Sequence, residues 1–367
     1  MLRLLVSAGG TGGGVYPALA VVAALGEKAD VLWVGGRGGM EAGLVGRAGI
    51  AFQAIPAAGL HGVGLRALPS NALQLARGVP AARRVIKRFK PDVLFFTGGY
   101  VGVPVSVAGR RLPQAVFVPD VEPALALRLI TRRADLIALS TPDSRRCYNE
   151  SAPVVVTGYP LRSEMQVVDA RNARRSFGLA PEERTLLVYG GSRGARSINE
   201  ALWANMERVL GVVQVLHITG ELDWPRVADI QAGLTASQLA RYRAHAYLHD
   251  RMAQALSAAD LALTRSGAAT LGELPRFGLP AILVPYPHAW RYQRVNADYL
   301  ADHGGAIVVE DATLTARLPE LVADLFEDAG QLERMRSASR GLDKPDAAAA
   351  IAAEIARLFE ERSAAHG

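Results

Sequence analysis

Two glycine-rich segments carry the residues whose types and spacing most clearly point to chemistry. The first runs from Gly9 to Gly14 and includes Thr11, Gly12 and Gly13, and the second runs from Gly190 to Ala195. Each segment follows an apolar run and precedes a stretch typical of a helix. Successive glycines at such a junction let backbone N–H groups and the positive helix end approach a phosphate closely. The two segments therefore predict sites for a phosphorylated ligand, with a tight turn that binds nothing as the alternative.

The familiar nucleotide motifs do not fit these glycines. The redox dinucleotide fingerprint would need a glycine where Val15 stands, and an acidic residue after the second strand, where the chain reads Gly35-Gly36-Arg37. The G-x-x-x-x-G-K-[ST] phosphate loop is absent from the sequence. These mismatches argue against a dinucleotide-dependent oxidoreductase and a P-loop nucleotidase.

A third candidate segment, Arg265 to Glu273, follows the apolar run at 261–263. The small residues Gly267 and Ala268 permit close contact with a ligand. Glu273 falls about one and a half turns into the expected helix. A carboxylate there can accept hydrogen bonds from both hydroxyls of a ribose, with a solvated surface glutamate as the alternative.

Short apolar runs bounded by glycine or proline predict the parallel strands that position these segments. In the first half we expect strands at 2–7, 31–34, 93–96, 115–118, 136–139 and 154–156, and a helix opened by Pro17. In the second half we expect strands at 185–189, 213–218, 261–263, 281–284 and 306–309. Strand, glycine turn and helix recur in both halves, so the expected fold class is α/β with two open parallel sheets.

The length of 367 residues fits two domains of this kind. We place an N-terminal domain at residues 1–160 and a C-terminal domain at 161–344, with the crossing at Thr157–Pro160. Pro345 is placed to open a final helix at about 345–367, which we expect to pack back on the first domain.

Charge and cysteine content limit which partners and which cellular environment we expect for the protein. Residues 1–160 hold 18 Lys and Arg against 9 Asp and Glu, and the whole chain has a net charge of +6, so the basic surface belongs to the first domain. Such a surface suits nucleic acid, an anionic membrane or a phosphorylated substrate. The single cysteine, Cys147, cannot form an internal disulfide. Glycines interrupt the uncharged stretch Leu4–Gly26, so we expect neither a secretory signal nor a membrane span.

Six motifs together resemble the MurG family, the peptidoglycan N-acetylglucosaminyltransferases that act on undecaprenyl-pyrophosphoryl-muramyl-pentapeptide (lipid I). They follow in order along nearly the whole chain: GGTGGGVYPALAV (Gly9–Val21), TGGYVGVP (Thr97–Pro104), TGYPLR (Thr157–Arg162), GGSRGARSIN (Gly190–Asn199), RSGAATLGE (Arg265–Glu273) and GLPAILVPYPHAWRYQRVNA (Gly278–Ala297). The resemblance implies a GT-B glycosyltransferase fold, in which two Rossmann-like domains with parallel sheets face a cleft. It also implies inverting transfer of GlcNAc from UDP-GlcNAc to the 4-hydroxyl of MurNAc in lipid I, which forms lipid II for peptidoglycan synthesis.

The resemblance implies roles for individual residues in donor binding. Ser192 would bind the diphosphate, Arg162 would face the same donor, and Glu273 would hold the uridine ribose. His249 stands where the family reads uracil through its backbone, and Gln293 where it binds the sugar hydroxyls. The start of the helix that carries Glu273 would meet sugar and phosphate through Ala268, Ala269, Thr270 and Leu271.

Three departures from the family pattern affect the expected chemistry. Gly14 stands where the family usually has a histidine, Tyr159 where it has an asparagine, and Tyr292 where it commonly has a glutamine. Another group must then accept the proton of the attacking hydroxyl. The candidates are carboxylates at the ends of first-domain strands or in the loops that follow: Asp120, Glu122 and Glu41.

A basic helical stretch predicts contact with an anionic membrane surface. It carries Arg83, Arg84, Lys87, Arg88 and Phe89, a mixture that suits lipid headgroups, with a solvated charged helix as the alternative. A polyprenyl-linked acceptor requires such docking, so we expect a cytoplasmic protein that is peripheral on the inner face of the plasma membrane. The expected partners are UDP-GlcNAc, lipid I and this surface, with other cell-wall synthesis proteins as candidates and no nucleic acid. We expect no required cofactor, although a divalent cation can assist.

Three other functions stay open at this point. Another GT-B glycosyltransferase would share the donor half and act on a different lipid acceptor, which TGGYVGVP disfavours. A UDP-GlcNAc 2-epimerase would share the fold and the nucleotide but would need no membrane surface. A UDP-sugar-binding regulator without catalysis would fit the glycine at position 14.

Overall fold

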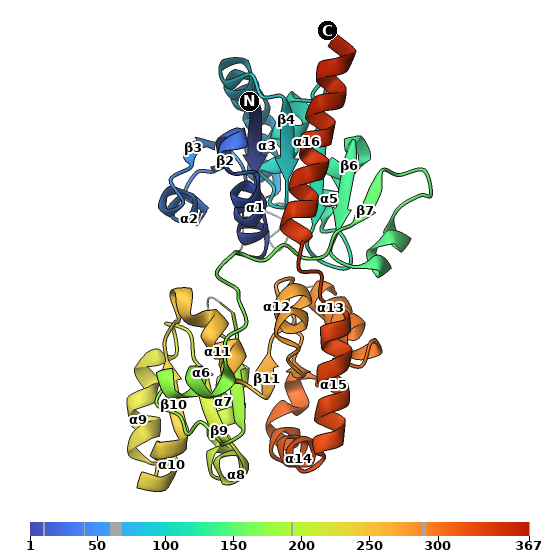
Figure 1. The fold of residues 1–367 in the computed structure, drawn as a ribbon. Helices are drawn as coiled ribbons and strands as arrows, with labels where there is room; N and C mark the ends of the chain where they lie inside the picture. Colours follow the sequence, from blue (N-terminus) through green and yellow to red (C-terminus); the bar gives the residue numbers. More distant parts are fainter. Residues whose placement is uncertain (10–11, 40, 59–67, 192–193, 288–290, 367) are drawn as a thin grey trace. The chain divides into compact units, whose positions relative to one another are not determined.

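The computed structural model describes residues 1–9, 12–39, 41–58, 68–191, 194–287 and 291–366. The chain forms two compact units, unit 1 with residues 1–162 and 344–367, and unit 2 with residues 163–343. In each unit helices flank a parallel sheet (Figure 1). Thr11 and Ser192, both predicted to bind substrate, lie outside the described residues.

Unit 1 is built on a seven-stranded sheet in the order β3-β2-β1-β4-β5-β6-β7, and all its strand pairs are parallel. The strands are β1 (Leu2–Ser7), β2 (Ala29–Gly36), β3 (Ala51–Ile55), β4 (Val93–Phe96), β5 (Gln114–Val118), β6 (Leu136–Leu139) and β7 (Val154–Val156). The α-helices are α1 (Gly12–Leu25), α2 (Glu41–Arg47), α3 (Leu68–Phe89), α4 (Gly102–Ala108), α5 (Leu125–Ile130) and α16 (Ala347–His366). Short 3₁₀ helices are η1 (Gly26–Lys28), η3 (Thr131–Arg133) and η4 (Pro142–Cys147).

The central strands of unit 1 were predictable because helices cover both faces of the sheet. Strands β4, β5 and β6 are buried at every position, so each reads as an unbroken apolar run. Strand β3 was missed. It lies at the edge, where Ala51 and Gln53 are exposed, and its short alternating pattern gives a weaker signal.

The prediction that Pro17 opens the first helix is wrong. Helix α1 begins at Gly12 and contains Pro17, which lacks the N–H that would donate to the carbonyl of Gly13. The hydroxyl of Tyr159 donates to that carbonyl instead, at 3.1 Å. A side chain from the segment after β7 therefore replaces the donor that proline removes.

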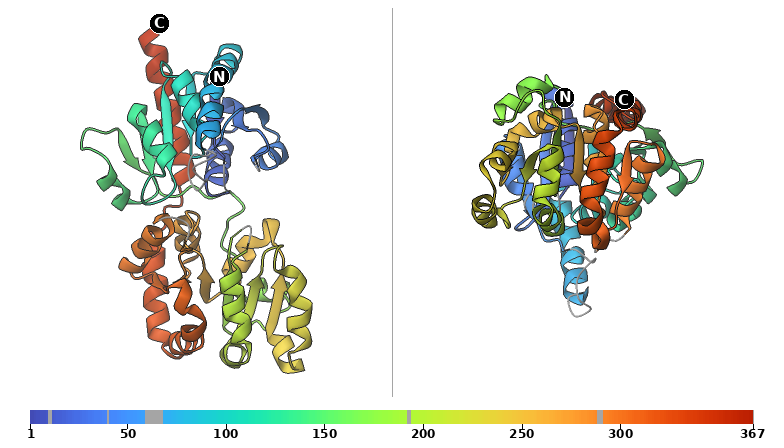
Figure 2. Two further views of the ribbon diagram at one scale, coloured as in Figure 1. Left: turned by 180° about the vertical axis from the view of Figure 1, so that it is seen from behind. Right: turned by 90° about the horizontal axis from the view of Figure 1, so that it is seen from below.

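Helix α16 packs along α1 within unit 1 (Figures 1 and 2). Its buried side chains recur every four residues at Ala347, Ile351 and Ile355, which places them on one face of the helix. The C-terminal segment is therefore part of the core of unit 1.

Unit 2 is built on a six-stranded parallel sheet in the order β10-β9-β8-β11-β12-β13. The strands are β8 (Thr185–Tyr189), β9 (Gln214–Ile218), β10 (Tyr242–His245), β11 (Leu261–Thr264), β12 (Ala281–Leu283) and β13 (Ala306–Val308). The α-helices are α6 (Ala170–Ser176), α7 (Arg196–Ala204), α8 (Met206–Val212), α9 (Val227–Ala232), α10 (Ala236–Arg241), α11 (Met252–Ala258), α12 (Thr270–Phe277), α13 (Tyr292–Asp302), α14 (Leu314–Glu327) and α15 (Ala329–Gly341). The 3₁₀ helices are η5 (Trp224–Arg226), η6 (His249–Arg251) and η7 (Asp311–Thr313).

Two elements of unit 2 differ from the prediction. The helix expected to run through Leu210 breaks at Asn205, whose side-chain amide donates to the carbonyls of Ala201 and Thr315, both at 2.9 Å. The edge strand β10 was missed because Arg243 and His245 interrupt its apolar pattern. The central strands β8, β9 and β11 are fully buried, and they match apolar runs in the sequence.

The strand order reverses at one place in each sheet. In unit 1 the chain moves outward from β1 to β3 and then returns beside β1 with β4, and in unit 2 it moves from β8 to β10 and returns beside β8 with β11. Open α/β sheets bind ligands outside the carboxyl ends of the strands at such a reversal. The segments after β1, β4, β8 and β11 carry four of the six motifs.

Candidate active site

In unit 1 the turns after β1 and β4 press backbone against backbone. A Cβ on Gly99, which has φ +84°, would lie 2.8 Å from the carbonyl oxygen of Gly9. Thr97 is fully buried, and its hydroxyl donates to the carbonyl of Gly14 at 2.5 Å. The predicted ligand residues Gly12 and Gly13 open α1 beside this contact. The TGG motif therefore supports the first turn of α1 and the residue before it.

Gly14 is not imposed by crowding. A Cβ at that position would lie 3.4 Å from the carbonyl oxygen of Thr97 and 3.7 Å from that of Gly9, which are ordinary contacts. A methyl group therefore fits at position 14, so Cβ contacts do not require a glycine there.

Glu41, one of the three base candidates, is buried with 2% of its surface exposed. Its Oε1 accepts from the N–H of Gly36 at 2.9 Å, and its other oxygen has no hydrogen-bond partner among the described residues. A Cβ on Gly39 would lie 2.3 Å from both oxygens, and one on Gly9 would lie 2.8 Å from Oε1. Glu41 thus sits in a cradle of glycines and holds the turn after β2, which disfavours it as the group that takes a proton from a substrate.

The other two candidates follow β5, where Ser140 holds the loop by donating to the carbonyls of Val118 and Pro119 at 2.9 Å. Asp120 is partly exposed. Glu122 is 9% exposed, and its Oε2 lies 3.8 Å from the guanidinium of Arg128. Of the three carboxylates Asp120 is the most accessible.

In unit 2 the turn after β8 rests on the backbone that follows β9. Gly194 has φ +78°, and a Cβ there would lie 2.3 Å from the carbonyl oxygen of Thr219. The buried amide of Asn199 on α7 donates to that same oxygen and to Oδ2 of Asp223, both at 2.9 Å. Asn199 therefore ties the helix after the glycine turn to the segment that supports the turn.

The side-chain amide of Asn199 also determines which ring nitrogen of His217 carries the proton. Because both of these hydrogen bonds use its Nδ2, its Oδ1 must accept from Nε2 of His217, 2.9 Å away. The Nδ1 of His217 then accepts from the hydroxyl of Tyr242, also at 2.9 Å. Complete burial lowers the pKa of His217 to about 3, although the nearby Asp223 carboxylate acts in the other direction. In the sequence this histidine is visible only as a polar residue within a mostly apolar strand.

The turn after β11 carries the predicted ribose and sugar residues. Ala268 and Ala269 lead into α12, where the hydroxyl of Thr270 donates to the carbonyl of Gly267 at 2.6 Å. Glu273 lies in the first turn of α12 and is partly exposed, next to the buried Leu271 and Gly272. The N–H groups of Thr270, Leu271 and Gly272 donate to the carbonyls of Gly267, Ala268 and Ala269. This helix start can therefore attract an anionic ligand through the positive end of its dipole.

Gln293, predicted to bind the sugar, has a defined orientation on α13. Its Oε1 accepts from the N–H of Tyr286 at 2.9 Å, so its amide N–H groups are the ones available to a ligand. The hydroxyl of Ser266 donates to the carbonyl of Gln293 at 2.6 Å, and this joins the start of α13 to the turn after β11. The two predicted sugar-binding segments are therefore brought together in unit 2.

Two further predicted residues have distinctive surroundings. His249 is exposed and has φ +45°, and its ring stacks edge-on against Tyr247 at 4.8 Å. Such a left-handed backbone is uncommon outside glycine and is frequent where backbone groups serve a ligand. Arg162 belongs to unit 1, where its guanidinium carbon lies 4.6 Å from the ring centroid of Tyr16 on α1.

Helix α3 presents Arg83, Arg84, Lys87 and Arg88 to solvent. Phe89, predicted to face a membrane, is instead partly buried against the core of unit 1 and lies under the guanidinium of Arg3, 4.8 Å from its ring centroid. The apolar residues at this end of α3 are needed for packing, so they are unavailable to lipid. No helix in the described part of the chain is long and apolar enough to cross a bilayer.

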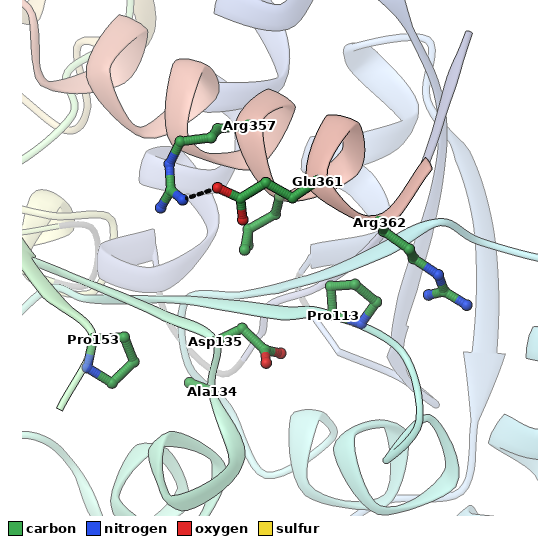
Figure 3. A pocket seen from close by; sticks show the side chains of 8 residues that line it. Pro113, Ala134, Asp135, Pro153, Arg357, Glu361 and Arg362 are labelled. Carbon is green, nitrogen blue, oxygen red and sulfur yellow. Dashed lines mark hydrogen bonds and ion pairs between the residues drawn. The ribbon is translucent and has the colours of Figure 1, made fainter. Parts of the chain in front are cut away.

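A hollow of about 490 Å³ in unit 1 lies away from these turns (Figure 3). Pro113, Asp135 and Pro153 line it and precede β5, β6 and β7, so it opens at the amino edge of the sheet. Its Arg357 and Glu361 pair with each other.

In the described ranges no three His, Cys, Asp or Glu side chains gather as a metal site would require.

Two parallel sheets, each with a glycine turn and a helix start at its reversal, have the architecture of the GT-B class of glycosyltransferases. The Glycosyltransferase family 28 N-terminal domain matches residues 4–135, and the Glycosyltransferase family 28 C-terminal domain matches residues 185–351. Both matches include the glycine turn of their unit.

Relatives over the full length identify the family more narrowly. The UDP-N-acetylglucosamine--N-acetylmuramyl-(pentapeptide) pyrophosphoryl-undecaprenol N-acetylglucosamine transferase of Roseiflexus sp. (strain RS-1) is 38% identical, over 99% of this chain and 97% of the relative. The enzyme of the same name from Desulforudis audaxviator (strain MP104C) is 37% identical, over 97% of this chain and 98% of the relative. The chain belongs to the family of these transferases, the MurG family.

Solved structures agree with this assignment. The crystal structure of Acinetobacter baumannii MurG superposes with a TM-score of 0.76 at 27% identity, over 97% of this chain and all of that one. A putative UDP-N-acetylglucosamine 2-epimerase from Listeria monocytogenes reaches a TM-score of 0.70 at 16% identity, over 98% of this chain and 97% of that one. The second likeness extends to the fold alone.

Proposed function

We propose that the protein transfers GlcNAc from UDP-GlcNAc to the 4-hydroxyl of MurNAc in lipid I, with inversion at C1, and so forms lipid II. The observation that carries the proposal is the family membership over the full length, together with the position of Glu273 and Gln293 at the carboxyl edge of the unit 2 sheet. The reaction needs no covalent enzyme intermediate, because the acceptor hydroxyl displaces UDP directly.

Unit 2 supplies the donor site in this proposal. The carboxylate of Glu273 would accept from the ribose hydroxyls, and the amide N–H groups of Gln293 would donate to the sugar. The helix starts after β8 and β11 would stabilise the negative charge that develops on the departing diphosphate. Arg162, which belongs to unit 1, is the further residue that the family resemblance assigns to the donor. Ser192 would donate to the same diphosphate, and the backbone at His249 would read the uracil.

Unit 1 supplies the acceptor site and the base. The turn from Gly9 to Gly14 would receive the diphosphate of lipid I, as its glycines and the start of α1 suggest. Asp120 is the proposed proton acceptor, because it is the accessible carboxylate on a loop that Ser140 holds in place.

A basic and apolar surface on α3, α4 and α5 would dock unit 1 on an anionic membrane. Leu125 is 44% exposed and Leu129 40% exposed, and Leu129 lines a groove of about 450 Å³ between α4 and α5. Arg132 and Arg133 line the same groove, and α3 packs against α4. Exposed leucines beside arginines suit the headgroup region, where each basic residue gains about 1 kcal/mol from anionic lipid.

The docking surface can be tested with vesicles. Replacing Arg83, Arg84, Lys87 and Arg88 by glutamine should weaken binding to vesicles that contain phosphatidylglycerol and leave turnover of a soluble short-chain acceptor nearly intact. A matched control replaces four exposed arginines of unit 2: Arg171, Arg175, Arg208 and Arg317. If both variants lose the same vesicle affinity, total charge rather than this surface governs binding.

Release of UDP that depends on lipid I tests the function itself. The protein should release UDP from UDP-GlcNAc only when lipid I is present, and it should form an alkali-stable disaccharide on the lipid. Epimerisation of UDP-GlcNAc without acceptor would support an epimerase instead. Release with diacylglycerol but not with lipid I would indicate a different lipid glycosyltransferase, and binding without release would indicate a regulator.

A further inference from the structure

The structure assigns Arg265 as a positioning residue of the donor edge, where it clamps the segments that follow four strands of unit 2. We call Arg265, Ser197 and Asp311 the donor clamp. The inference rests on the proposed function, because the segments that the clamp holds are those proposed to bind UDP-GlcNAc.

The donor clamp is a closed ring of hydrogen bonds. Arg265 follows β11 directly, and its Nη2 donates to the hydroxyl of Ser197 on α7 at 2.7 Å. Its Nη1 donates to Oδ1 of Asp311, which also accepts from the Ser197 hydroxyl at 2.7 Å. The same Nη1 donates to the carbonyl of Val284 at 3.1 Å. The ring thus joins segments that follow β8, β11, β12 and β13.

The donor clamp also extends toward the predicted sugar contact. The guanidinium carbon of Arg265 lies 5.2 Å from the ring centroid of Tyr286. The backbone N–H of Tyr286 in turn donates to Oε1 of Gln293 at 2.9 Å. One side chain therefore connects the helix after the glycine turn, the turn after β11 and the amide that would read the sugar.

The surroundings of Arg265 fit positioning better than ligand binding. Its side chain is 10% exposed, and its guanidinium already donates to a carboxylate, a hydroxyl and a carbonyl of the protein. A planar guanidinium with five N–H groups can hold several acceptors in one fixed geometry, which lysine cannot do. Ligand sites of this kind require their loops to stay within about 0.5 Å of the productive geometry.

The opposite end of the same strand provides a matched comparison. Asp260 precedes β11, and its Oδ2 lies 2.7 Å from Nη2 of Arg174. The side chains of Arg174 and Asp260 are 10% and 20% exposed, against 10% and 23% for Arg265 and Asp311. The two pairs have similar burial, and Arg174–Asp260 lies at the amino edge, away from the ligand turns. Asp260 also accepts from the N–H of Thr185 at 2.8 Å and lies 3.6 Å from Nη2 of Arg336.

The test compares Asp311→Asn with Asp260→Asn in the full-length protein. Both substitutions remove one carboxylate charge beside a nearly buried arginine, so both should lower Tm. Only Asp311→Asn should raise the Kd for UDP, by about tenfold as expected for loss of a charge-assisted contact that orders the site. Hydrogen exchange should become faster at the starts of α7 and α12 in Asp311→Asn alone. Ser197→Thr keeps a hydroxyl and should restore most of the affinity that Ser197→Ala loses.

The outcomes separate the clamp from the function on which it rests. An unchanged Kd for UDP in Asp311→Asn, or equal losses of affinity in the two variants, would overturn the positioning role. If the unmodified protein does not bind UDP, the proposed function fails. Hydrogen exchange then still tests the positioning role of the donor clamp. Faster exchange at α7 and α12 in both variants, or in neither, would overturn that role.

Discussion

The two units share one topology, but they support their ligand turns in different ways. In unit 1 the turn after β1 rests on backbone contacts and single hydroxyls, with Gly99 against Gly9 and the hydroxyls of Thr97 and Tyr159 on the first turn of α1. In unit 2 the turn after β8 also has a backbone contact, between Gly194 and Thr219, but a buried network of Asn199 and its polar partners is added to it. The same strand order is therefore compatible with two kinds of support.

The difference follows from what each edge would hold. A buried polar network permits one arrangement, because any loss leaves a polar group unsatisfied in a low-dielectric interior. Such rigidity suits unit 2, which would bind a small nucleotide sugar through many contacts. In unit 1 fewer polar side chains support the turn, namely two hydroxyls in addition to backbone contacts. This unit would bind a large lipid-linked acceptor and supply the base.

The largest expected effect is on catalysis and lies in unit 1. Asp120→Asn should lower kcat by at least about 10²-fold with saturating donor and leave UDP binding unchanged, because a positioned base contributes roughly 10² to 10⁴-fold. Glu122→Gln should have a smaller effect, since Glu122 is nearly buried beside Arg128.

Glu41→Gln serves as the control for Asp120→Asn. It should keep kcat within a few-fold and lower stability, because the carboxylate sits in a glycine cradle. If all three variants retain kcat, the proton leaves to water or to a group outside these carboxylates. Supplying the base would then no longer set unit 1 apart from unit 2.

The next effect is on donor affinity and lies in unit 2. Glu273→Ala should raise the Kd for UDP-GlcNAc by the equivalent of about 1.5 to 3 kcal/mol, the scale of hydrogen bonds to a charged group, with little change in kcat. Glu207→Ala, which removes an exposed glutamate from α8, is the matched control. Equal donor affinity of both variants by calorimetry would mean that the nucleotide does not bind at α12.

The sequence predicted most of the fold because the central strands are buried on both faces and read as apolar runs. It missed β3 and β10, since an edge strand has one exposed side and a mixed pattern. The glycine turns and Glu273 were visible as motifs. The supports were not, because the contacts of Arg265 with Asp311 and of Asn199 with His217 join residues far apart in the chain. The base was also ambiguous in the sequence, which does not show that Glu41 is buried whereas Asp120 is accessible.

The third effect is the pH dependence of stability, which the network of unit 2 should impose. Folded His217 has a pKa of about 3, lowered by burial, against about 6.5 in an unfolded chain. The unfolded state therefore binds more protons between these values, and the free energy of unfolding should fall as pH drops from 6.5 toward 3. The expected loss from pH 6.5 to pH 5 is between about 1 and 2 kcal/mol, because the unfolded histidine is already half protonated at pH 6.5.

Urea unfolding followed by tryptophan fluorescence can measure this loss, because Trp203 lies against His217 with ring centroids 5.8 Å apart. His217→Gln should lower stability at pH 7 and flatten the pH dependence. His249→Gln, at an exposed histidine, should leave the slope unchanged. A slope that persists in His217→Gln would mean that other groups cause it and that the network does not set unit 2 apart.

The smallest expected effect concerns the hydroxyl that supports the first turn of α1 in unit 1. A double-mutant cycle can measure it. Tyr159 donates to the carbonyl of Gly13, which has no helical donor because residue 17 is proline. Tyr159→Phe keeps the ring, which packs edge-on against Phe117 at 5.8 Å, and deletes the hydroxyl. The partly buried carbonyl of Gly13 then loses this partner, and unit 1 should lose about 1 kcal/mol of stability.

Pro17→Ala supplies the missing N–H from within the helix, so the tyrosine hydroxyl should become redundant in that background. Tyr159→Phe should then cost clearly less in Pro17→Ala than in the parent, and the interaction between the two substitutions should be at least about 0.5 kcal/mol. Additive losses by thermal unfolding would show that the hydroxyl does not replace the proline's missing donor. In that case the end of α1 depends on Thr97 and backbone packing, and the contrast between the two units becomes sharper still.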